Sequence, residues 1–298
     1  QNTAEIGGAI SNGGMPDGAV NCTFNNNTAR DSGGAMAFTD AINCSFTGNN
    51  VIGGKGTAMF GYDDYICHAV NCIFTSNNAD KEVLVNVTAD SCIFNGGDAP
   101  GEGVVVYQPD LSVNNFISAY NDGSVLAINL TSRSGVPIDD ANIQVDVYTS
   151  AGAFVGTYNT TSSGWKVPLN AGSYVAKFNA TDFDNVTAEG NITVNKDKSA
   201  ITSKAVTTIY NKNKYLVITL KDSKGNALSG QTVTVTLASA KKYKTDKNGQ
   251  IKINVAKLLP KAYDAIISFA GNENYSESSA TVKVTVNKIS SNINASDV

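Results

Sequence analysis

The chain has 298 residues, and its charged fraction of 16% is well below the ~25% of typical globular proteins. Its length predicts two or three domains, and no run approaches the ~18 consecutive apolar residues of a membrane-spanning helix. The net charge of −4 is unevenly spread: residues 196–298 hold 16 of the 22 basic and 7 of the 26 acidic residues, which gives +9 there and −13 on residues 1–195. The asymmetry either keeps each region soluble or favours anionic partners for the basic segment.

The first part of the chain contains a six-residue block that recurs, with a small apolar residue at its start, a Cys in fourth place and a Phe at its end. Its copies are Ala19–Phe24, Ala41–Phe46, Ala69–Phe74 and Ala89–Phe94, with a weaker fifth at Leu111–Phe116. A second element precedes each block, at Gly7–Ile10, Gly33–Met36, Thr57–Met59, Val83–Val85 and Val104–Val106. Each unit therefore holds at least two short strands separated by turns. Because Gln1 falls inside this pattern, we expect the natural chain to begin before it.

Strand alternation places Val20, Cys22 and Phe24 on one face of the first block, and Asn21 and Thr23 on the other. One unit cannot bury its apolar face, but units stacked in register ~4.8 Å apart bury a continuous column. Outward Asn side chains at equivalent positions then form an amide ladder, at Asn21, Asn43 and Asn71. The repeat predicts a right-handed parallel β-helix whose core ladder is Cys22, Cys44, Cys72 and Cys92 with Phe24, Phe46, Phe74 and Phe94.

The β-helix is expected to end near residue 118, because polar residues enter inward positions at Asp90, Ser112 and Asn114. A leucine-rich repeat is the alternative of similar period, but its L-x-x-L-x-L core is absent. The cysteine spacing fits no zinc motif. Cysteines stacked in register keep their Cβ atoms farther apart than the ~3.8 Å of a disulfide, so a column of free, buried thiols is expected rather than a ladder of disulfides.

After residue 118 the pattern changes to separate alternating strands, as at Leu126–Leu130, Ile143–Val147, Leu216–Leu220 and Ile251–Val255. Asn248-Gly249 between two such strands is a strong hairpin signal. The Val-Asn-Lys sequence that ends at Lys196 recurs ending at Lys288. This part predicts two immunoglobulin-like β-sandwiches, at 119–195 and 196–288, and residues 289–298 as the start of a further module or a linker.

The Gly-Gly-Ala-Ile element and the Phe-x-x-Asn spacing (Phe24 to Asn27, Phe46 to Asn49, Phe74 to Asn77) resemble the repeats of chlamydial polymorphic membrane proteins and of adhesin-like surface proteins of methanogenic archaea. The fourth copy departs from this pattern, with Gly97 where Asn is expected. The later modules resemble the bacterial-type immunoglobulin-like repeats that follow such β-helices. The resemblance implies an extracellular, cell-surface protein of archaeal type that adheres to other cells.

An enzyme is the alternative of another class, since many β-helix proteins degrade polysaccharides. The groups available for acid-base work are Arg30, Asp31, Asp40, Lys55, Asp63 and Asp64, and the Asp pair lies in the one expanded coil, residues 53–68. Solvated turns explain these residues equally well, and His68 has no nucleophile signature beside it. No catalytic residue, metal site or cofactor is therefore expected, and the lysines of 241–247 are interpreted as a solvated hairpin rather than a nucleic-acid site.

Asn-x-Ser/Thr sequences occur at eleven positions, of which the favoured glycosylation candidates are Asn129, Asn159, Asn179, Asn185, Asn191 and Asn274. The function expected is that of a non-enzymatic adhesin or structural stalk, with the β-helix exposed and the sandwiches as a spacer. Its partner would be a glycan or protein of another cell. A second hypothesis is a self-assembling extracellular filament, in which an acidic end meets a basic end of another copy and exposed strand edges pair.

Overall fold

The computed structural model describes residues 1–11, 18–78 and 80–291, which form β-strands and connections without any helix. The all-β class expected from the sequence is confirmed. No helix in these ranges is long and apolar enough to cross a membrane. The chain divides into two compact units, which are described separately. Unit 1 contains residues 1–116, 125–167 and 174–192, and unit 2 contains residues 117–124 and 168–173 with the chain from Thr193 on.

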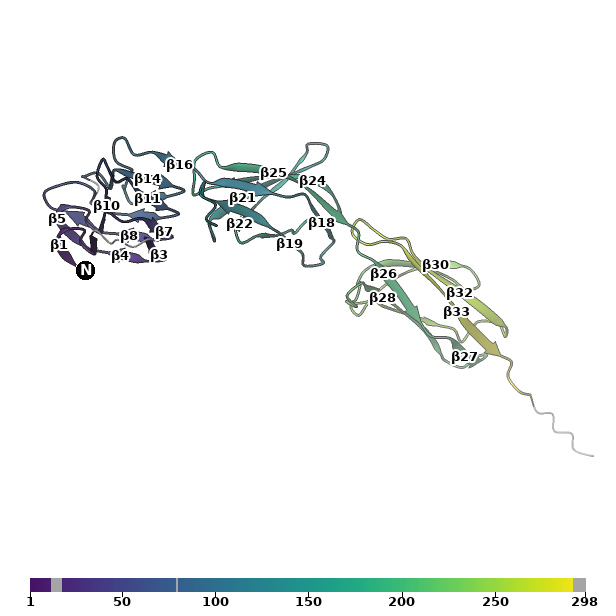
Figure 1. Cartoon of the computed structure of the whole chain (residues 1–298). Helices are drawn as coiled ribbons and strands as arrows, with labels where there is room; N and C mark the ends of the chain where they lie inside the picture. The colour runs from purple at the N-terminus through teal and green to yellow at the C-terminus, as the bar shows by residue number, and fades with distance from the viewer. Residues whose placement is uncertain (12–17, 79, 292–298) are drawn as a thin grey trace, which may run out of the picture. The chain divides into compact units, whose positions relative to one another are not determined.

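The first part of unit 1 winds through four parallel sheets (Figure 1), because each block of the repeat pairs with the same block one coil later. Two of these sheets contain β1 (Thr3–Ile6), β5 (Thr28–Ser32) and β9 (Asn50–Val51), and β2 (Ile10–Ser11), β6 (Met36–Ala37), β10 (Met59–Phe60) and β13 (Leu84–Val85). The third contains β3 (Ala19–Val20), β7 (Ala41–Ile42), β11 (Cys67–Val70), β14 (Val87–Asp90) and β16 (Val106–Tyr107). The fourth contains β4 (Thr23–Asn25), β8 (Ser45–Thr47), β12 (Ile73–Thr75) and β15 (Ile93–Asn95).

The repeated Gly-Gly pair is required by how closely neighbouring coils approach. Gly33 has a φ of +64°, in the left-handed region that glycine adopts without steric cost. A Cβ on Gly34 would lie 2.0 Å from the carbonyl oxygen of Thr57 in the next coil. The first glycine therefore makes the turn, and the second allows the backbones to stack.

The interior of the coils is a column of identical side chains in register. Phe46 lies between Phe24 and Phe74, with ring centroids 4.9 Å away on each side, and the Phe74 and Phe94 centroids are 5.1 Å apart. Phe24, Phe46 and Phe74 are buried, whereas Phe94 is half-buried. Stacked rings of this kind bury a large apolar area per coil.

Val20 does not point inward as the alternation predicted, since 43% of its surface is exposed. The reason is the conformation of Asn21, whose φ of +54° turns the chain and divides the block into two strands. Ala19 before the turn and Phe24 after it are buried instead. A period of two holds only within one strand, and it does not carry across a corner.

A second row of buried side chains runs parallel to the Phe column and consists of amides. The Oδ1 atom of Asn49 accepts hydrogen bonds of 3.0 Å from both the backbone N–H and Nδ2 of Asn27. The Oδ1 atom of Asn77 accepts the same two bonds from Asn49, at 3.0 and 2.9 Å. Asp98 ends the row, because its Oδ2 accepts from the N–H and Nδ2 of Asn77 at 3.1 and 2.7 Å. The ladder position that Gly97 seemed to vacate is therefore filled by the next residue.

The fifth block does not form a further coil. Its first half lies in β17 (Asp110–Val113), which pairs antiparallel with β20 (Ile128–Thr131). Ser112 and Asn114 are exposed and the block has no Cys, so it lacks the inward face that stacking requires. These residues belong to the first sandwich.

The first sandwich combines that pair with a five-stranded sheet and a short third pair (Figure 1). The five-stranded sheet has the order β18 (Phe116–Ala119), β25 (Thr187–Asn195), β24 (Gly172–Ala180), β21 (Asn142–Thr149) and β22 (Phe154–Thr161). The short pair is β19 (Val125–Leu126) with β23 (Trp165–Lys166). Alternating residues such as Ile143, Val145 and Val147 are buried, as expected for a sheet with one face in the core.

The second sandwich lies in unit 2 and has two sheets around one core (Figure 1). One sheet contains β26 (Ser199–Ser203), β28 (Tyr215–Asp222) and β31 (Gln250–Asn254). The other has the order β27 (Val206–Ile209), β33 (Ser278–Asn287), β32 (Ala262–Phe269), β29 (Thr232–Thr236) and β30 (Ala240–Lys244). The turn before β31 closes on Asp246, which accepts the N–H groups of Asn248 and Gln250 at 2.8 and 2.9 Å.

Candidate functional site

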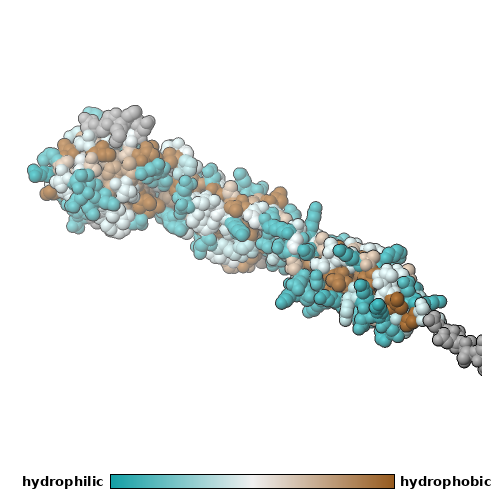
Figure 2. Space-filling model, turned by 90° about the horizontal axis from the view of Figure 1, so that it is seen from below, coloured by the Kyte–Doolittle hydropathy of each residue, from teal (hydrophilic) through white to brown (hydrophobic). Residues whose placement is uncertain are grey.

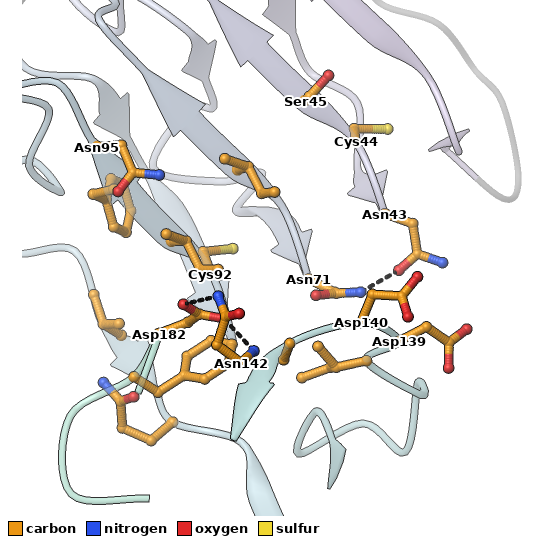
Figure 3. Close-up of a pocket in the computed structure, with 18 of the residues that line it drawn as sticks. Asn43, Cys44, Ser45, Asn71, Cys92, Asn95, Asp139, Asp140, Asn142 and Asp182 are labelled. Carbon is orange, nitrogen blue, oxygen red and sulfur yellow. Dashed lines mark hydrogen bonds between the residues drawn. The ribbon is translucent and has the colours of Figure 1, made fainter. Parts of the chain in front are cut away.

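A cleft of about 1060 Å³ lies within unit 1, between the corners of the coils and two loops of the first sandwich (Figure 3). One wall comes from successive blocks of the repeat, and the other comes from residues 138–142 and 181–184. The first loop leads into β21 and the second follows β24, and these two strands are paired so that Ile143 lies opposite Ala180. The two loops are therefore held side by side at one end of the sheet.

The coil wall of the cleft presents neutral polar groups. Asn21, Asn43 and Asn71 make the corners between strands with φ values of +54°, +54° and +51°, a conformation that Asn tolerates better than most residues. The Nδ2 of Asn71 donates to the Oδ1 of Asn43 at 2.8 Å (Figure 3). Beside this row, Ser45 donates to the hydroxyl of Thr23 at 3.2 Å. The wall thus offers amides and hydroxyls at the coil spacing.

The loop wall presents carboxylates. Asn142 donates its backbone N–H to Oδ2 of Asp182 at 2.7 Å and its Nδ2 to Oδ1 at 3.0 Å, which orients that carboxylate. Asp140 has a φ of +58° and accepts the hydroxyl of Ser163 at 2.7 Å. Figure 3 shows Asp139 and Asp140 close to the Asn43–Asn71 pair, and Asp182 beside Asn142. Hydrogen-bond acceptors of this wall therefore lie near the amide row of the other.

Cysteines of the repeat belong to the coil wall, where Cys22, Cys44 and Cys92 line the cleft. All five cysteines of the chain carry free thiols; Cys44, Cys72 and Cys92 are buried and Cys22 is half-buried. The thiols of Cys44 and Cys92 each donate to a carbonyl of the preceding coil at 3.2 Å. A hydrogen bond with Cys72 and burial raise the pKa of the Cys44 thiol far above its usual value, and burial raises the pKa of Cys72 as well. Protonated, buried thiols are poor nucleophiles and poor metal ligands.

The residues considered for acid-base catalysis do not line the cleft. Asp40 lies beside His68, with a carboxylate to Nδ1 distance of 3.6 Å, and also accepts the His68 backbone N–H at 2.7 Å. Asp63 accepts from Nδ2 of Asn86 at 3.1 Å. The remaining candidates, Arg30, Asp31, Lys55 and Asp64, are exposed, and Lys55 is paired with Glu82 at 3.1 Å. They lie along the coils and do not converge on the cleft.

The six glycosylation candidates differ in how their amide groups are engaged. Asn129, Asn159, Asn185 and Asn191 are exposed, and Asn179 and Asn274 are half-buried. The Nδ2 of Asn191 donates to Asn115 at 3.2 Å, and the Nδ2 of Asn274 donates to Asn170 at 3.0 Å. The Nδ2 of Asn129 donates to the hydroxyl of Ser112 at 3.4 Å. A glycan at any of these three sites would leave a single N–H on Nδ2 to make the existing hydrogen bond.

The loop wall was not identified from the sequence. Asp139, Asp140 and Asp182 follow or precede strands in positions where turns are common, and nothing in the local pattern relates them to the corners of the coils. The Asn row, by contrast, repeats at the period of the blocks. In the described ranges, no group of three or more His, Cys, Asp or Glu side chains is placed to hold a metal ion.

No protein-family model and no curated protein sequence matches the chain. Among solved structures, it is similar to fibronectin(III)-like modules of CbhA from Clostridium thermocellum, with 13% identity over 62% of this chain and 100% of that one and a TM-score of 0.27. It is also similar to the D0-D1 domain of intimin, with 17% identity over 59% of this chain and 94% of that one and a TM-score of 0.22. A third similar structure is domains 1–6 of the surface layer protein SbsC, with 15% identity over 65% of this chain and 31% of that one and a TM-score of 0.29. Likenesses with TM-scores this low assign no function to the chain.

Proposed function

We propose that the chain is part of a non-enzymatic cell-surface adhesin or structural stalk. In this proposal the coils that precede β17 are the last rungs of a right-handed parallel β-helix that meets the partner. Two immunoglobulin-like modules form the spacer, the first extended by β17 beyond the expected 119–195 and the second at 196–288, and residues 289–298 begin a further module or a linker. The cleft carries the proposal, because its walls combine a row of neutral amides with oriented carboxylates.

Such walls suit a ligand rich in hydroxyl or amide groups, that is, a glycan or a polar protein segment on another cell. Hydroxyl and amide hydrogens of the ligand would bond to the carboxylates of the loop wall, and its oxygens would accept from the amides of the coil wall. Specificity in such sites comes from a few well-placed polar groups. The pKa of the Cys44 thiol is raised by its hydrogen bond with Cys72 and by burial, and the pKa of Cys72 is raised by burial, so both thiols stay protonated and act as packing groups.

An extracellular, cell-surface location is part of the proposal. It is supported by the resemblance of the repeat to adhesin-like proteins of methanogenic archaea and by glycosylation sequences on exposed strand positions, such as Asn129 and Asn159. Asn159 and Asn185 are the sites we expect to be occupied first, because both are exposed. The Nδ2 groups of Asn129, Asn191 and Asn274, in contrast, donate hydrogen bonds to other side chains. Mass spectrometry of the glycopeptides from the native source measures this.

Binding of the full chain to intact cells and to a printed glycan array tests the function. The informative variant is Asn71→Gly, which removes the amide from the coil wall, while glycine keeps the backbone φ of +51° without strain. Asp139→Asn removes a carboxylate from the opposite wall. Each change should weaken binding at least ~10-fold, the loss expected for one well-placed polar contact.

Asn211→Gly is the matched control, since Asn211 has a φ of +64° and lies in unit 2. It should leave binding unchanged. The proposal would be wrong if Asn71→Gly and Asp139→Asn bound cells and glycans as well as the Asn211→Gly control does. Hydrolysis of an array glycan by the full chain would also show that the cleft is not an adhesive site of this kind.

A self-assembling filament is the second candidate, and one observation favours it. The basic residues 196–298 carry +9 and lie in unit 2, whereas residues 1–195 carry −13. Figure 2 shows hydrophilic surface over much of the visible face of the second sandwich. Opposite charges on two parts of one chain favour head-to-tail association of copies.

A further inference from the structure

The expanded coil carries an aromatic cluster that belongs neither to the core nor to the cleft. Its connection between β10 and β11 is residues 61–66, whereas the connection in the preceding coil is residues 38–40 and that in the following coil is Asn86 alone. Within it, Tyr62 and Tyr65 exchange backbone hydrogen bonds of 3.1 and 2.9 Å. The longer connection is thus a small, ordered hairpin with the turn at Asp63 and Asp64.

Three aromatic rings pack together at the base of this hairpin. The rings of Phe38 and Tyr62 are stacked, with centroids 4.8 Å apart and planes inclined by 15°. Phe60 packs edge-on against both, with centroids at 6.0 Å from Phe38 and 5.5 Å from Tyr62. One face of the Tyr62 ring is therefore supported by the protein, which fixes its orientation.

The hairpin leaves large apolar groups in solvent. Tyr62 is 55% exposed, Tyr65 is 52% exposed and Ile66 is 54% exposed. Tyr62 and Tyr65 are directly paired across the hairpin, so their side chains project from the same face. The coiled region shows hydrophobic surface among hydrophilic surface in Figure 2. Contiguous exposed apolar groups mark interaction or ligand sites.

Phe38 adds an independent observation. Its φ is +58°, a left-handed conformation that is an outlier for a bulky residue. The equivalent corner two coils later holds Asn86, with a φ of +51°, a residue that adopts this conformation readily. The chain thus places a strained phenylalanine where asparagine would relieve the strain, and the result is a ring stacked under Tyr62. Strain of this kind is characteristic of functional sites.

Polar groups of the hairpin and of the neighbouring connections are held in place by hydrogen bonds. Asp63 accepts from the amide of Asn86 at 3.1 Å, and Asp40 accepts from the backbone of His68 at 2.7 Å with the imidazole 3.6 Å away. Asp64 is exposed at the tip of the hairpin. The hairpin that carries the supported Tyr62 ring therefore also carries two carboxylates, Asp63 and Asp64, and the first is oriented by the amide of Asn86.

We infer that the hairpin 61–66, with Phe38 and Phe60 beneath it, is a binding platform for a neutral pyranose unit of a glycan. The apolar C–H face of the sugar would stack on Tyr62, and its hydroxyls would donate to Asp63 and Asp64. The rings touch one another and leave no cage between them, which disfavours a quaternary ammonium ligand. The carboxylates disfavour uronic acids and nucleic acid phosphates by like-charge repulsion.

This platform deepens the proposed adhesive function by naming a ligand class, but it lies on another set of residues than the cleft. The two can therefore fail separately. Binding of intact cells that depends on Asn71 and not on Tyr62 would support the cleft alone, and the reverse result would support the platform alone.

Saturation-transfer NMR of the full chain with methyl glycosides of glucose, mannose and galactose tests the platform, and methyl glucuronide is the acidic probe. We expect saturation of ring C–H protons for at least one neutral glycoside and none for the glucuronide. Tyr62→Ala should raise the dissociation constant at least ~10-fold, while Tyr62→Phe keeps the ring and should change it less than ~3-fold. Tyr215→Ala removes a tyrosine that is 50% exposed in the second sandwich and should have no effect.

Asp63→Asn provides a second variant that keeps the acceptor for Asn86 and removes the charge. This variant should weaken binding of the neutral glycoside and leave the melting temperature of the protein unchanged. Three results would overturn the inference: no saturation with any neutral glycoside, binding retained in Tyr62→Ala, or glucuronide bound as well as the neutral probes. A loss of folding in Tyr62→Ala, seen as altered circular dichroism, leaves Asp63→Asn and Tyr62→Phe to decide.

Discussion

At the scale of single residues, the buried amide row explains an unusual carboxylate. Besides the hydrogen bonds within this row, Nδ2 of Asn49 donates to the Phe24 carbonyl and Nδ2 of Asn77 donates to the Phe46 carbonyl, each at 2.9 Å. In Asp98 the corresponding atom is Oδ1, a buried oxygen without a hydrogen-bond partner among the described residues. A carboxylate oxygen cannot donate there, whereas an amide or a protonated carboxyl can.

We therefore expect Asp98→Asn to stabilise the last coil at neutral pH. The asparagine would restore the donor toward the carbonyl of Phe74, the equivalent of Phe46 one coil later, and remove an unsatisfied buried acceptor that costs ~1–3 kcal/mol. Hydrogen exchange of the backbone amides of β12 and β15 measures the gain. Asp98→Ala is the control and should lower protection, because Asn77 then loses its acceptor.

The gain should depend on pH. Burial raises the pKa of Asp98, so the protonated form stabilises the folded state below the unfolded pKa of ~3.9, and this contribution is lost as the pH rises through the folded pKa. The gain in stability of Asp98→Asn over the wild type should accordingly be larger at pH ~7 than at pH ~3.5. Equal gains at both values would mean that Oδ1 is satisfied in another way.

The thiols give a second prediction at this scale. Burial raises the pKa of Cys67 to about 11, and burial and thiol hydrogen bonds raise those of Cys44 and Cys72. At pH ~8 these groups are protonated and shielded, so a water-soluble thiol reagent should modify half-buried Cys22 first. Mass spectrometry of the modified peptides measures the order, and denaturant should release the remaining four. Rapid reaction of Cys44 in the folded chain would contradict this packing.

At the scale of elements, the stability of the coils comes from columns rather than from single blocks. Each strand of the fourth sheet is three residues long and could not persist alone. Phe46 is fully buried between two other rings. The column therefore transmits the loss of any one ring to the coils on both sides.

Phe46→Ala should destabilise unit 1 by ~3–5 kcal/mol, because it removes a buried ring and leaves a cavity between two coils. Thermal or urea unfolding monitored by circular dichroism measures the change. Phe154→Ala is the matched control, since Phe154 is 60% exposed on β22 and its loss should cost little. If the two variants melt alike, the stacked column does not limit stability.

At the scale of the whole molecule, the uneven charge decides between the two proposed functions. Association between the segments that carry +9 and −13 would weaken as salt screens their attraction. An adhesin fragment should sediment as a monomer at both low and high salt and still bind cells. Ordered polymers at low salt that dissolve at high salt, without cell binding by the full chain, would instead favour the filament.

The sequence alone was sufficient for the features that repeat along it. The all-β class, the positions of the blocks and the outward Asn row follow from residues that recur at equivalent places, because side chains in register must share one environment. The Phe-x-x-Asn spacing also contained the buried amide row, although the sequence did not reveal that Asn27, Asn49 and Asn77 are buried.

Only the tertiary structure decided the features that depend on a corner or on contact between distant segments. Val20 faces solvent because Asn21 adopts a left-handed conformation, and a local alternation cannot register that turn. Leu111–Phe116 joined the first sandwich because β20 offered an antiparallel partner, and Asp98 took the ladder position one residue later than expected. The cleft arises in the same way: its carboxylates lie more than forty residues from the nearest corner asparagine in sequence, and folding alone brings the two walls together.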